Sequence, residues 1–542
     1  MTPYVHLIGH LLCKGQTPFG ERGLNAGVVV IGAGMGGLAC ATLLAARGER
    51  VTVIEKDSWV GGKARRVSLD GAEIDGGPTV FTLRDVFDGI FRAAGAELDD
   101  YVTTRRAGVL ARHAWDDSAY LDLHADPQRS EEAIGDFAGT EAAAGFRAFR
   151  TEARSIYATL NDTMMRAPKP ATPLSLVWRV GLSNIAGFVG THPYVSLWNA
   201  LGKHFGDQRL RQLFARYSTY CGSSPFNAPA TLMLIAHVEA MGVWLIDGGM
   251  AALAKALQDL SKSQGATYRL GTAVERIDVT GGRASGVILA NGERIAADAV
   301  IANADPAAIA SGLFGQNASR AVSQFGTSER SLSAFVWYAK ARAQSFPLVR
   351  HNVFFSPDYP REFLDIAAGT PPSDPTAYVC ALDRDPGRGE APGRTERFQI
   401  IVNAPANGDN HCYTPEEIDQ CTKAMMRSLT RCGLKLDDPF THEVATPNTF
   451  EKLWPSTGGA LYGRASHGWA ASFRRQGTRT KIPGLYCAGG STHPGAGVPM
   501  AALSGQLAAA RVLQDLASMR KSHPVVMGGG MSTPSAQTES TG

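Results

Sequence analysis

The amino-acid sequence predicts an α/β fold in which a Rossmann-like nucleotide-binding domain is combined with an α+β domain that contains a mostly antiparallel sheet. Three observations lead to this prediction. The apolar run 28–31 enters a glycine-rich turn and then an alanine-rich helical segment. Short β-type runs within 268–302 return to the same α/β character. Between residues 313 and 477, β-type runs alternate with loops rich in proline and glycine, which is typical of antiparallel sheets.

The clearest motif is the strand–turn–helix–strand unit of residues 28–55. Gly32, Gly34 and Gly37 fill a G-x-G-x-x-G pattern, and Glu55 follows the second strand. Gly32 permits the tight turn, Gly34 lets the backbone approach a pyrophosphate, and Gly37 lets the helix pack close to the strand. Phosphates are expected at the helix N-terminus, where free N–H groups favour negative charge. Because an acidic residue suits unphosphorylated ribose hydroxyls, the unit favours FAD or NAD over NADP.

Composition and charge narrow the class of protein. With 542 residues the chain is long enough for two or more domains and a large core. A net charge of +3 without a dense basic tract argues against a nucleic-acid partner. The eight cysteines are scattered and form no C-x-x-C pair, so free thiols are expected rather than disulfides or a metal site.

The two ends of the chain are expected to lie outside the folded core. Residues 1–26 contain one short apolar patch, 5–12, which has no basic residues before it and is too short to cross a bilayer. We therefore expect an N-terminal extension on an intracellular protein, with neither a signal peptide nor a transmembrane helix. Residues 519–542, rich in Gly, Ser, Thr and Pro, are expected to be a disordered tail.

A second pair of glycine-rich segments follows the first unit. Gly61 and Gly62 precede Lys63, and a further doublet occupies 76–77. These loops are expected to approach the cofactor, where Lys63 and Arg65 could meet phosphate charge. An ordinary surface hairpin is the alternative.

The middle of the chain is expected to be largely helical. Residues 83–165 and 205–243 have helical character, whereas 174–198 is a crowded apolar stretch. For that stretch a buried helical hairpin is favoured, and a monotopic membrane surface or the wall of an apolar tunnel remains open. Further on, a hairpin turn is expected at 291–292, and helices are expected over 414–432 and 500–516.

These segments, in this order, resemble the carotenoid desaturase family, the bacterial-type phytoene dehydrogenases within the wider flavin amine oxidase fold. The resemblance extends from residue 27 to about residue 516. Its most specific part is 484–499, with the core Thr492-His493-Pro494-Gly495-Ala496-Gly497. Supporting matches are Glu55 followed by Gly61-Gly62, Asp75-Gly76-Gly77-Pro78-Thr79, Gly248-Gly249-Met250 and Asn303-Ala304-Asp305.

The resemblance implies FAD, bound by one domain made of three segments, 27–105, 246–306 and 481–518. The substrate and membrane-facing domain, 106–245 and 307–480, is inserted between them. Many relatives have arginine where this chain has Lys63, which keeps the charge but not the bidentate fork. Cofactor-binding residues implied by the resemblance are Gly32, Ala33, Gly34, Met35, Gly36, Gly37, Glu55, Lys56, Gly61, Gly62, Lys63, Val274, Gly490, Ser491, Thr492, His493, Gly497 and Val498.

Three shorter stretches, 217–226, 402–405 and 498–500, are similar to the branch of hydroxycarotenoid 3,4-desaturases. This implies desaturation of a 1-hydroxycarotenoid such as hydroxyneurosporene, by hydride transfer to flavin and loss of a proton from the adjacent carbon. Phytoene or neurosporene is the alternative substrate. An isoprenoid-binding escort protein without catalysis is the alternative from another class, against which the intact glycine motifs argue.

A proton acceptor is harder to predict. Glu239 precedes a segment that approaches the flavin in this fold, and burial would raise its pKa toward that of a useful base. A structural ion pair is favoured over this catalytic role. The resemblance further implies peripheral association with the inner, photosynthetic membrane from the cytoplasmic side, and oxygen or a quinone as electron acceptor.

Overall fold

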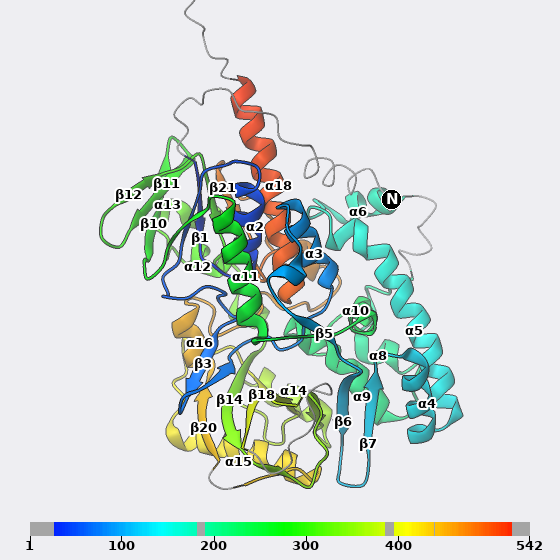
Figure 1. The fold of residues 1–542 in the computed structure, drawn as a ribbon. Helices are drawn as coiled ribbons and strands as arrows, with labels where there is room; N and C mark the ends of the chain where they lie inside the picture. The colour runs from blue at the N-terminus through cyan, green and yellow to red at the C-terminus, as the bar shows by residue number, and fades with distance from the viewer. Residues whose placement is uncertain (1–26, 182–189, 385–394, 438–439, 523–542) are drawn as a thin grey trace, which may run out of the picture.

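The computed structural model describes residues 27–181, 190–384, 395–437 and 440–522 (Figure 1). The predicted N-terminal extension and most of the predicted disordered tail lie outside these ranges. Within them the chain forms mixed α/β architecture around two main sheets, as the sequence predicts.

The first sheet is parallel and is assembled from three distant parts of the chain. Its order is β21-β13-β1-β2-β9, and every neighbouring pair is parallel. The strands are β1 (Val28–Ile31), β2 (Val51–Ile54), β9 (Thr267–Arg269), β13 (Ala299–Ala302) and β21 (Leu485–Cys487). Because all four residues of β1 and of β13 are buried, both read as continuous apolar runs, as expected for a parallel sheet covered on both faces.

Alternate residues of the strands face two different cores. Val28 and Val30 pack with four helices, whereas Val29 and Ile31 pack against a small antiparallel sheet and two short helices. The four helices are α2 (Met35–Ala45), α3 (Arg84–Ala93), α11 (Gly249–Ser263) and α18 (Val498–Ser522). The other layer contains β10 (Val274–Thr280), β11 (Arg283–Leu289), β12 (Arg294–Ala296), α12 (Pro306–Ala310) and α13 (Gln316–Ser319).

Helix α2 is buried along its whole length, which explains its small residues. A Cβ at Gly37 would lie 2.3 Å from the carbonyl oxygen of Gly32. A Cβ at Gly505 of α18 would lie 2.2 Å from the carbonyl oxygen of Gly36. Only glycine lets α2 approach both the turn before it and α18 so closely.

The second sheet has seven strands in the order β20-β14-β18-β17-β16-β6-β7, all antiparallel except the β6–β16 pair. A mostly antiparallel sheet is therefore confirmed. Helix α15 (Pro415–Arg431), predicted over 414–432, packs on one face through Met425 and Leu429. The strands are β6 (Val109–Ala114), β7 (Tyr120–His124), β14 (Ser333–Ala341), β16 (His351–Phe354), β17 (Ala377–Ala381), β18 (Glu396–Ala404) and β20 (Thr441–Ala445).

The prediction that 83–165 is helical throughout is wrong for 104–124, which forms β5 (Thr104–Arg106), β6 and β7. Strand β6 pairs with β16, so Arg112 lies opposite Asn352. This pairing is made with a segment far along the chain, and such tertiary contacts override local propensity. The remaining helical prediction is confirmed by α3, α4 (Pro127–Ala138) and α5 (Thr140–Leu160).

A helical layer, drawn in cyan and green in Figure 1, runs along one side of both main sheets. It includes η2 (Asn161–Met165), α6 (Pro173–Val180), α8 (Leu197–Leu201), α9 (Gln208–Ala215), η4 (Arg216–Cys221), η5 (Ala230–Met233) and α10 (Leu234–Met241). The other short elements are β3 (Arg66–Leu69), β4 (Ala72–Asp75), η1 (Leu98–Asp100), β8 (Trp244–Ile246), η6 (Thr327–Glu329), β15 (Ala343–Gln344), α14 (Tyr359–Ala367), β19 (Lys435–Leu436), α16 (Pro447–Leu453) and α17 (Ala471–Arg474).

The favoured prediction of a buried helical hairpin over 174–198 is wrong for α6. Leu174 is 64% exposed and Trp178 is 76% exposed, whereas Leu176 and Val180 of the same helix are buried. Residues 182–189 lie outside the described ranges. In the part of the chain that is described, no helix combines the length and the hydropathy needed to cross a membrane.

Candidate functional site

One cavity of about 1240 Å³ lies between the two main sheets. It is lined by the glycine turn after β1, by one face of the second sheet, by η4 and α10, and by α6. Single small-molecule sites usually have volumes of about 300–1,000 Å³. The cavity is therefore large enough for a cofactor and a second elongated ligand.

At one end of the cavity, the N-terminus of α2 offers free N–H groups. Gly32, Gly34, Met35 and Gly36 line this end, and Gly34, the N-cap residue, has no side chain to cap the helix. The first N–H groups of a helix have no partners inside the helix, so they favour a bound anion. Two predicted residues have other positions: Ala33 and Gly37 do not line the cavity but serve the packing around the turn.

Glycines from three parts of the chain meet at this turn. A Cβ at Gly36 would lie 2.7 Å from the backbone nitrogen of Gly489, and a Cβ at Gly62 would lie 3.2 Å from Cα of Gly34. The Gly61 N–H donates to the carbonyl oxygen of Ala33 at 2.8 Å. Gly61 and Gly62 line the cavity, and the hairpin β3–β4 follows them. The approach of this loop to a cofactor stays a prediction.

Glu55 lies beside this turn with its carboxylate held in place. Its Oε2 accepts from the Ala33 N–H at 2.7 Å, and its Oε1 accepts from the Asp57 N–H at 3.0 Å. Burial raises the pKa of Glu55, and the two backbone hydrogen bonds oppose that rise. Each carboxylate oxygen keeps a further lone pair for a sugar hydroxyl. Lys56, whose Nζ bonds Asp57 at 3.0 Å, and Val274 also line the cavity here.

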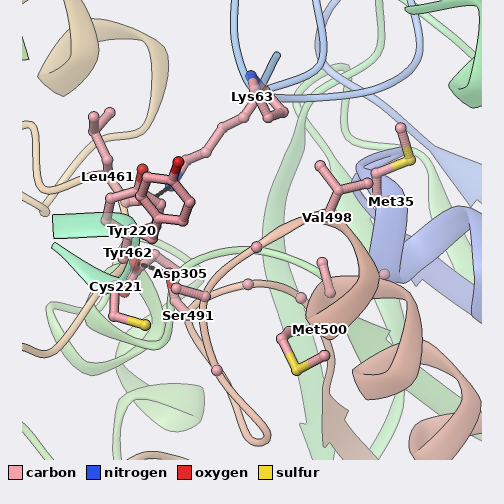
Figure 2. A pocket seen from close by; sticks show the side chains of 18 of the residues that line it. Met35, Lys63, Tyr220, Cys221, Asp305, Leu461, Tyr462, Ser491, Val498 and Met500 are labelled. Carbon is pink, nitrogen blue, oxygen red and sulfur yellow. Dashed lines mark hydrogen bonds between the residues drawn. The ribbon is translucent and has the colours of Figure 1, made fainter. Parts of the chain in front are cut away.

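The C-terminal glycine loop forms another wall. Gly490, Ser491, Gly497 and Val498 line the cavity, and the Ser491 hydroxyl donates to Asp305 at 2.6 Å. Figure 2 shows Ser491 beside Asp305, and Val498 near Met35 and Met500.

Thr492 and His493, predicted to contact the cofactor, are buried and do not line the cavity. The Thr492 hydroxyl donates to the carbonyl oxygen of Gly489 at 2.7 Å, and His493 Nε2 bonds the carbonyl oxygen of Ala167 at 2.9 Å. Burial lowers the pKa of His493 to about 4, so the ring is neutral and donates this bond. Both side chains hold the loop in shape.

Lys63 reaches across the cavity rather than toward the helix N-terminus. Its Nζ donates to the carbonyl oxygen of Leu461 (Figure 2). The same Nζ lies 5.0 Å from the ring centroid of Trp454. Burial lowers the pKa of Lys63 to about 8, although Asp305 opposes this shift. Lys63 thereby connects the parallel-sheet half of the cavity with the half formed by the second sheet.

The second sheet also holds the glycine loop at 76–79, through contacts that the sequence did not reveal. Tyr338 Oη donates to the carbonyl oxygen of Gly76 at 3.0 Å, and Gln399 Nε2 donates to that of Gly77 at 2.9 Å. The hydroxyls of Thr79 and Tyr378 share a 2.6 Å hydrogen bond. These partners lie more than 250 residues further along the chain, so no local motif could indicate them.

Glu239 is buried in α10 and lines the cavity. Its Oε2 accepts from the Tyr217 hydroxyl and its Oε1 accepts from the Tyr220 hydroxyl at 3.1 Å. Arg216 Nη1 donates to the same Tyr220 oxygen at 2.8 Å. Because both carboxylate oxygens are engaged in a network with a cation, this geometry favours the structural role over the catalytic one.

A second buried carboxyl group in the cavity went unnoticed in the sequence. Glu362 of α14 accepts from the Thr376 N–H at 3.1 Å and from Asn403 Nδ2 at 3.1 Å. Burial raises its pKa to about 7, more than these hydrogen bonds lower it. It sits in a run, 359–367, that shows no catalytic pattern, so only the tertiary structure identifies it.

The other end of the cavity reaches the surface through apolar side chains. Pro173, Leu174, Val177, Tyr194 and Trp469 line this end. Leu174 and Tyr194 are 64% and 77% exposed, and Tyr194 lies 5.6 Å from Trp469 between ring centroids. Exposed apolar groups of this kind, gathered at an opening, mark an interaction surface.

Comparisons with known proteins agree with this architecture. The family described as flavin containing amine oxidoreductase matches residues 35–513. A hydroxyneurosporene desaturase of Rubrivivax gelatinosus is 50% identical over 94% of this chain and 98% of its own length. A hydroxyneurosporene desaturase of Cereibacter sphaeroides is 45% identical over 91% of this chain and 98% of its own. Among solved structures, an oxidoreductase from Methanosarcina mazei has a TM-score of 0.57 at 17% identity, covering 90% of this chain and 99% of its own.

Proposed function

The chain belongs to the flavin-containing amine oxidoreductase family, and we propose that it desaturates the 3,4 bond of a 1-hydroxycarotenoid such as hydroxyneurosporene. It is an oxidoreductase of the carotenoid desaturase type, and its cofactor is FAD. One observation carries the proposal: a single cavity joins the glycine turn to a largely apolar channel that opens at exposed Leu174 and Tyr194. A long polyene needs such a channel, because it has no polar groups along most of its length.

The residues of the first end suit FAD. We assign the pyrophosphate to the N-terminus of α2 at Gly34 and Gly36, and the adenosine ribose to Glu55. Val274 is assigned to the adenine, and Gly490, Ser491, Gly497 and Val498 to the ribityl chain and flavin. When bound, FAD supplies the oxidising chemistry of the reaction.

The chain contributes position and exclusion of water. The loop 76–79 is fixed by Tyr338, Gln399 and Tyr378, so that it presents a rigid edge to the flavin end of the cavity. Apolar side chains from α10 and the second sheet keep water from the substrate carbon atoms. A proton must also leave the substrate, and we propose that Glu362, a buried carboxyl that lines the cavity and has a raised pKa, accepts it.

We further propose that the rim of the cavity rests on a membrane surface, from which the carotenoid enters. The support is the exposed set Leu174, Trp178, Tyr194 and Trp469, three of which line the opening. Leu174→Ser is expected to weaken sedimentation with liposomes. Leu364→Ser is the matched control, because Leu364 is also a helical leucine, 65% exposed, but does not line the cavity. Equal binding of both variants would contradict the membrane role.

The proposed reaction is tested by supplying phytoene, neurosporene and hydroxyneurosporene separately in liposomes to the FAD-loaded enzyme. Hydroxyneurosporene is expected to gain one conjugated double bond, seen as a red shift of its absorption. Consumption of phytoene alone would show that the chain acts earlier in desaturation. A colourless protein that is unable to take up FAD would contradict the proposed desaturase activity on any carotenoid. Running the same assay with oxygen and with a quinone identifies the electron acceptor, which we propose to be one of these two.

A further inference from the structure

Arg216, at the start of η4, is a buried cation with unused hydrogen-bond donors. It is 5% exposed and lines the cavity. Its Nη1 donates to Tyr220 Oη at 2.8 Å, whereas its Nε and Nη2 have no hydrogen-bond partner in the described structure. A guanidinium carries five N–H donors, and burying them unpaired is costly. Such donors in a cavity wall point to an acceptor atom on a ligand.

Two tyrosines and a carboxylate complete the polar patch. Tyr220 Oη donates to Glu239 Oε1 at 3.1 Å, and the Glu239 carboxylate offsets the Arg216 charge. Tyr359, from α14, lines the same cavity and interacts electrostatically with Arg216, and its buried hydroxyl has no hydrogen-bond partner among the described residues. The Glu362 carboxyl lies near Tyr359 on the same helix, and the apolar part of the lining includes Leu234, Ile235, Val238, Leu332 and Val353. A hydrocarbon alone would leave this patch unsatisfied.

We propose that Arg216, Tyr220 and Tyr359 form a hydroxyl site that binds the hydroxyl oxygen of the carotenoid substrate. This inference rests on the proposed function and adds the residues that select the hydroxylated substrate. An alcohol oxygen accepts a hydrogen bond from an Arg216 N–H, while its own proton is donated to a tyrosine oxygen. A carotenoid without the hydroxyl buries the same donors unpaired, so it binds less well.

The position of the hydroxyl site fits the chemistry. In a 1-hydroxycarotenoid only one carbon separates the hydroxyl-bearing carbon from the 3,4 bond, so the hydroxyl must bind near the flavin. Gly222 caps the end of η4 and packs closely against Tyr462: a Cβ added at Gly222 would lie 2.5 Å from the Tyr462 ring. A Cβ at Gly463 would lie 2.7 Å from Ser491 Cβ in the glycine loop. In the view of Figure 2, Tyr220 lies on the same side of the cavity as Tyr462, with Asp305 and Ser491 next to them.

The test compares kcat/KM for hydroxyneurosporene and for neurosporene in liposomes, using FAD-loaded enzyme. The two carotenoids differ by the hydroxyl, and their ratio of kcat/KM measures its recognition. We expect the wild-type ratio to be at least about 100. Tyr220→Phe and Arg216→Lys are each expected to lower this ratio about tenfold. Arg216→Lys has this effect because lysine keeps the positive charge but lacks the planar set of N–H donors of the guanidinium.

Tyr359→Phe is the variant least able to disturb folding, because it removes a hydroxyl that has no partner in the described structure. It is also expected to lower the ratio. Tyr413→Phe is the control: Tyr413 is buried and bonds Asn407 at 2.9 Å, but it does not line the cavity. Flavin absorbance of each purified variant reports whether the fold and cofactor site are intact.

Each outcome has a definite meaning. A wild-type ratio near one would overturn the hydroxyl site without any variant. A ratio within about threefold of wild type in Tyr220→Phe, Arg216→Lys and Tyr359→Phe would overturn it as well. If the wild-type enzyme, carrying FAD, converts neither carotenoid, the proposed function fails instead. A ratio that falls in the three variants and holds in Tyr413→Phe supports the assignment.

Discussion

Glu362 makes the free energy of unfolding of the protein depend on pH, and this dependence can be measured directly. Burial raises its pKa from the ordinary value of 4.5 to about 7. Because the folded state favours the neutral carboxyl, the stabilisation is fully present below about pH 4.5 and is lost as the pH rises toward about 7. One pH unit of such a shift corresponds to about 1.4 kcal/mol, so the loss amounts to about 3 kcal/mol.

The substitution Glu362→Gln reveals this pH dependence, because the glutamine side chain is neutral at every pH. The amide cannot satisfy both donors that now point at the carboxyl, Thr376 N–H and Asn403 Nδ2, so a constant destabilisation of about 1–3 kcal/mol is expected as well. The informative quantity is therefore the pH dependence of the difference between wild type and variant. For a chain of 542 residues, 1 kcal/mol corresponds to about 1 °C in Tm.

The assay is thermal unfolding of the FAD-loaded protein from pH 5 to pH 8, followed by flavin fluorescence. We expect the Tm of wild type relative to Glu362→Gln to fall by about 3 °C over this range. Glu416→Gln, at an exposed glutamate of α15, is expected to show no such trend. A Tm difference between wild type and Glu362→Gln that is constant with pH would show that Glu362 does not titrate with a raised pKa in the folded protein.

Three further predictions concern the cofactor end of the cavity. Gly36→Ala is expected to weaken FAD binding at least about tenfold, because its Cβ would lie within 2.9 Å of the backbone of Gly489 and Ala501. Gly89→Ala is the control, because no atom lies within 4 Å of its Cβ. Equal FAD content in the two variants would show that the close packing at Gly36 is not needed for FAD binding. Gln399→Leu is expected to raise the Kd for FAD about tenfold by freeing the loop at 76–79, and an unchanged Kd in a fluorescence titration would show that the loop is held otherwise. Wild-type affinity for FAD is expected to decline as the pH rises through about 8, because Lys63, which lines the same cavity, then loses its charge and its through-space attraction for an anionic cofactor. Lys63→Met is expected to show a flat profile, and parallel profiles of the two proteins would exclude this attraction.

The elements that the sequence predicted best are those whose cause is local. The β1 run, the glycine turn and α2 follow from residues within a few positions of one another, and Gly37 packs as its place in the motif requires. The strands β6 and β7 were missed because β6 is stabilised by pairing with β16. Helix α6 was expected to be buried because its composition is apolar, yet Leu174, at the opening of the cavity, and Trp178 are both exposed.

The residues of the candidate site likewise fall into those that a local motif predicts and those that only the tertiary structure brings together. Motif glycines and Glu55 lie where the pattern indicated, because backbone geometry restricts which residues fit there. Thr492 and His493 belong to the most specific motif, but their side chains bond backbone carbonyl groups outside the cavity and hold the loop in shape. Membership in a motif therefore did not define which way a side chain points. Glu362, Gln399 and Arg216 have no motif, and only the packing of distant elements brings them to the cavity.

We expect one cavity to hold FAD and the hydroxylated end of a carotenoid together. The decisive measurement is to add hydroxyneurosporene in liposomes to the purified FAD-loaded enzyme and to record the carotenoid spectrum. We expect a red-shifted product with one additional conjugated double bond, formed much faster than the product from neurosporene. An unchanged hydroxyneurosporene spectrum, with FAD bound and phytoene or neurosporene converted instead, would contradict it.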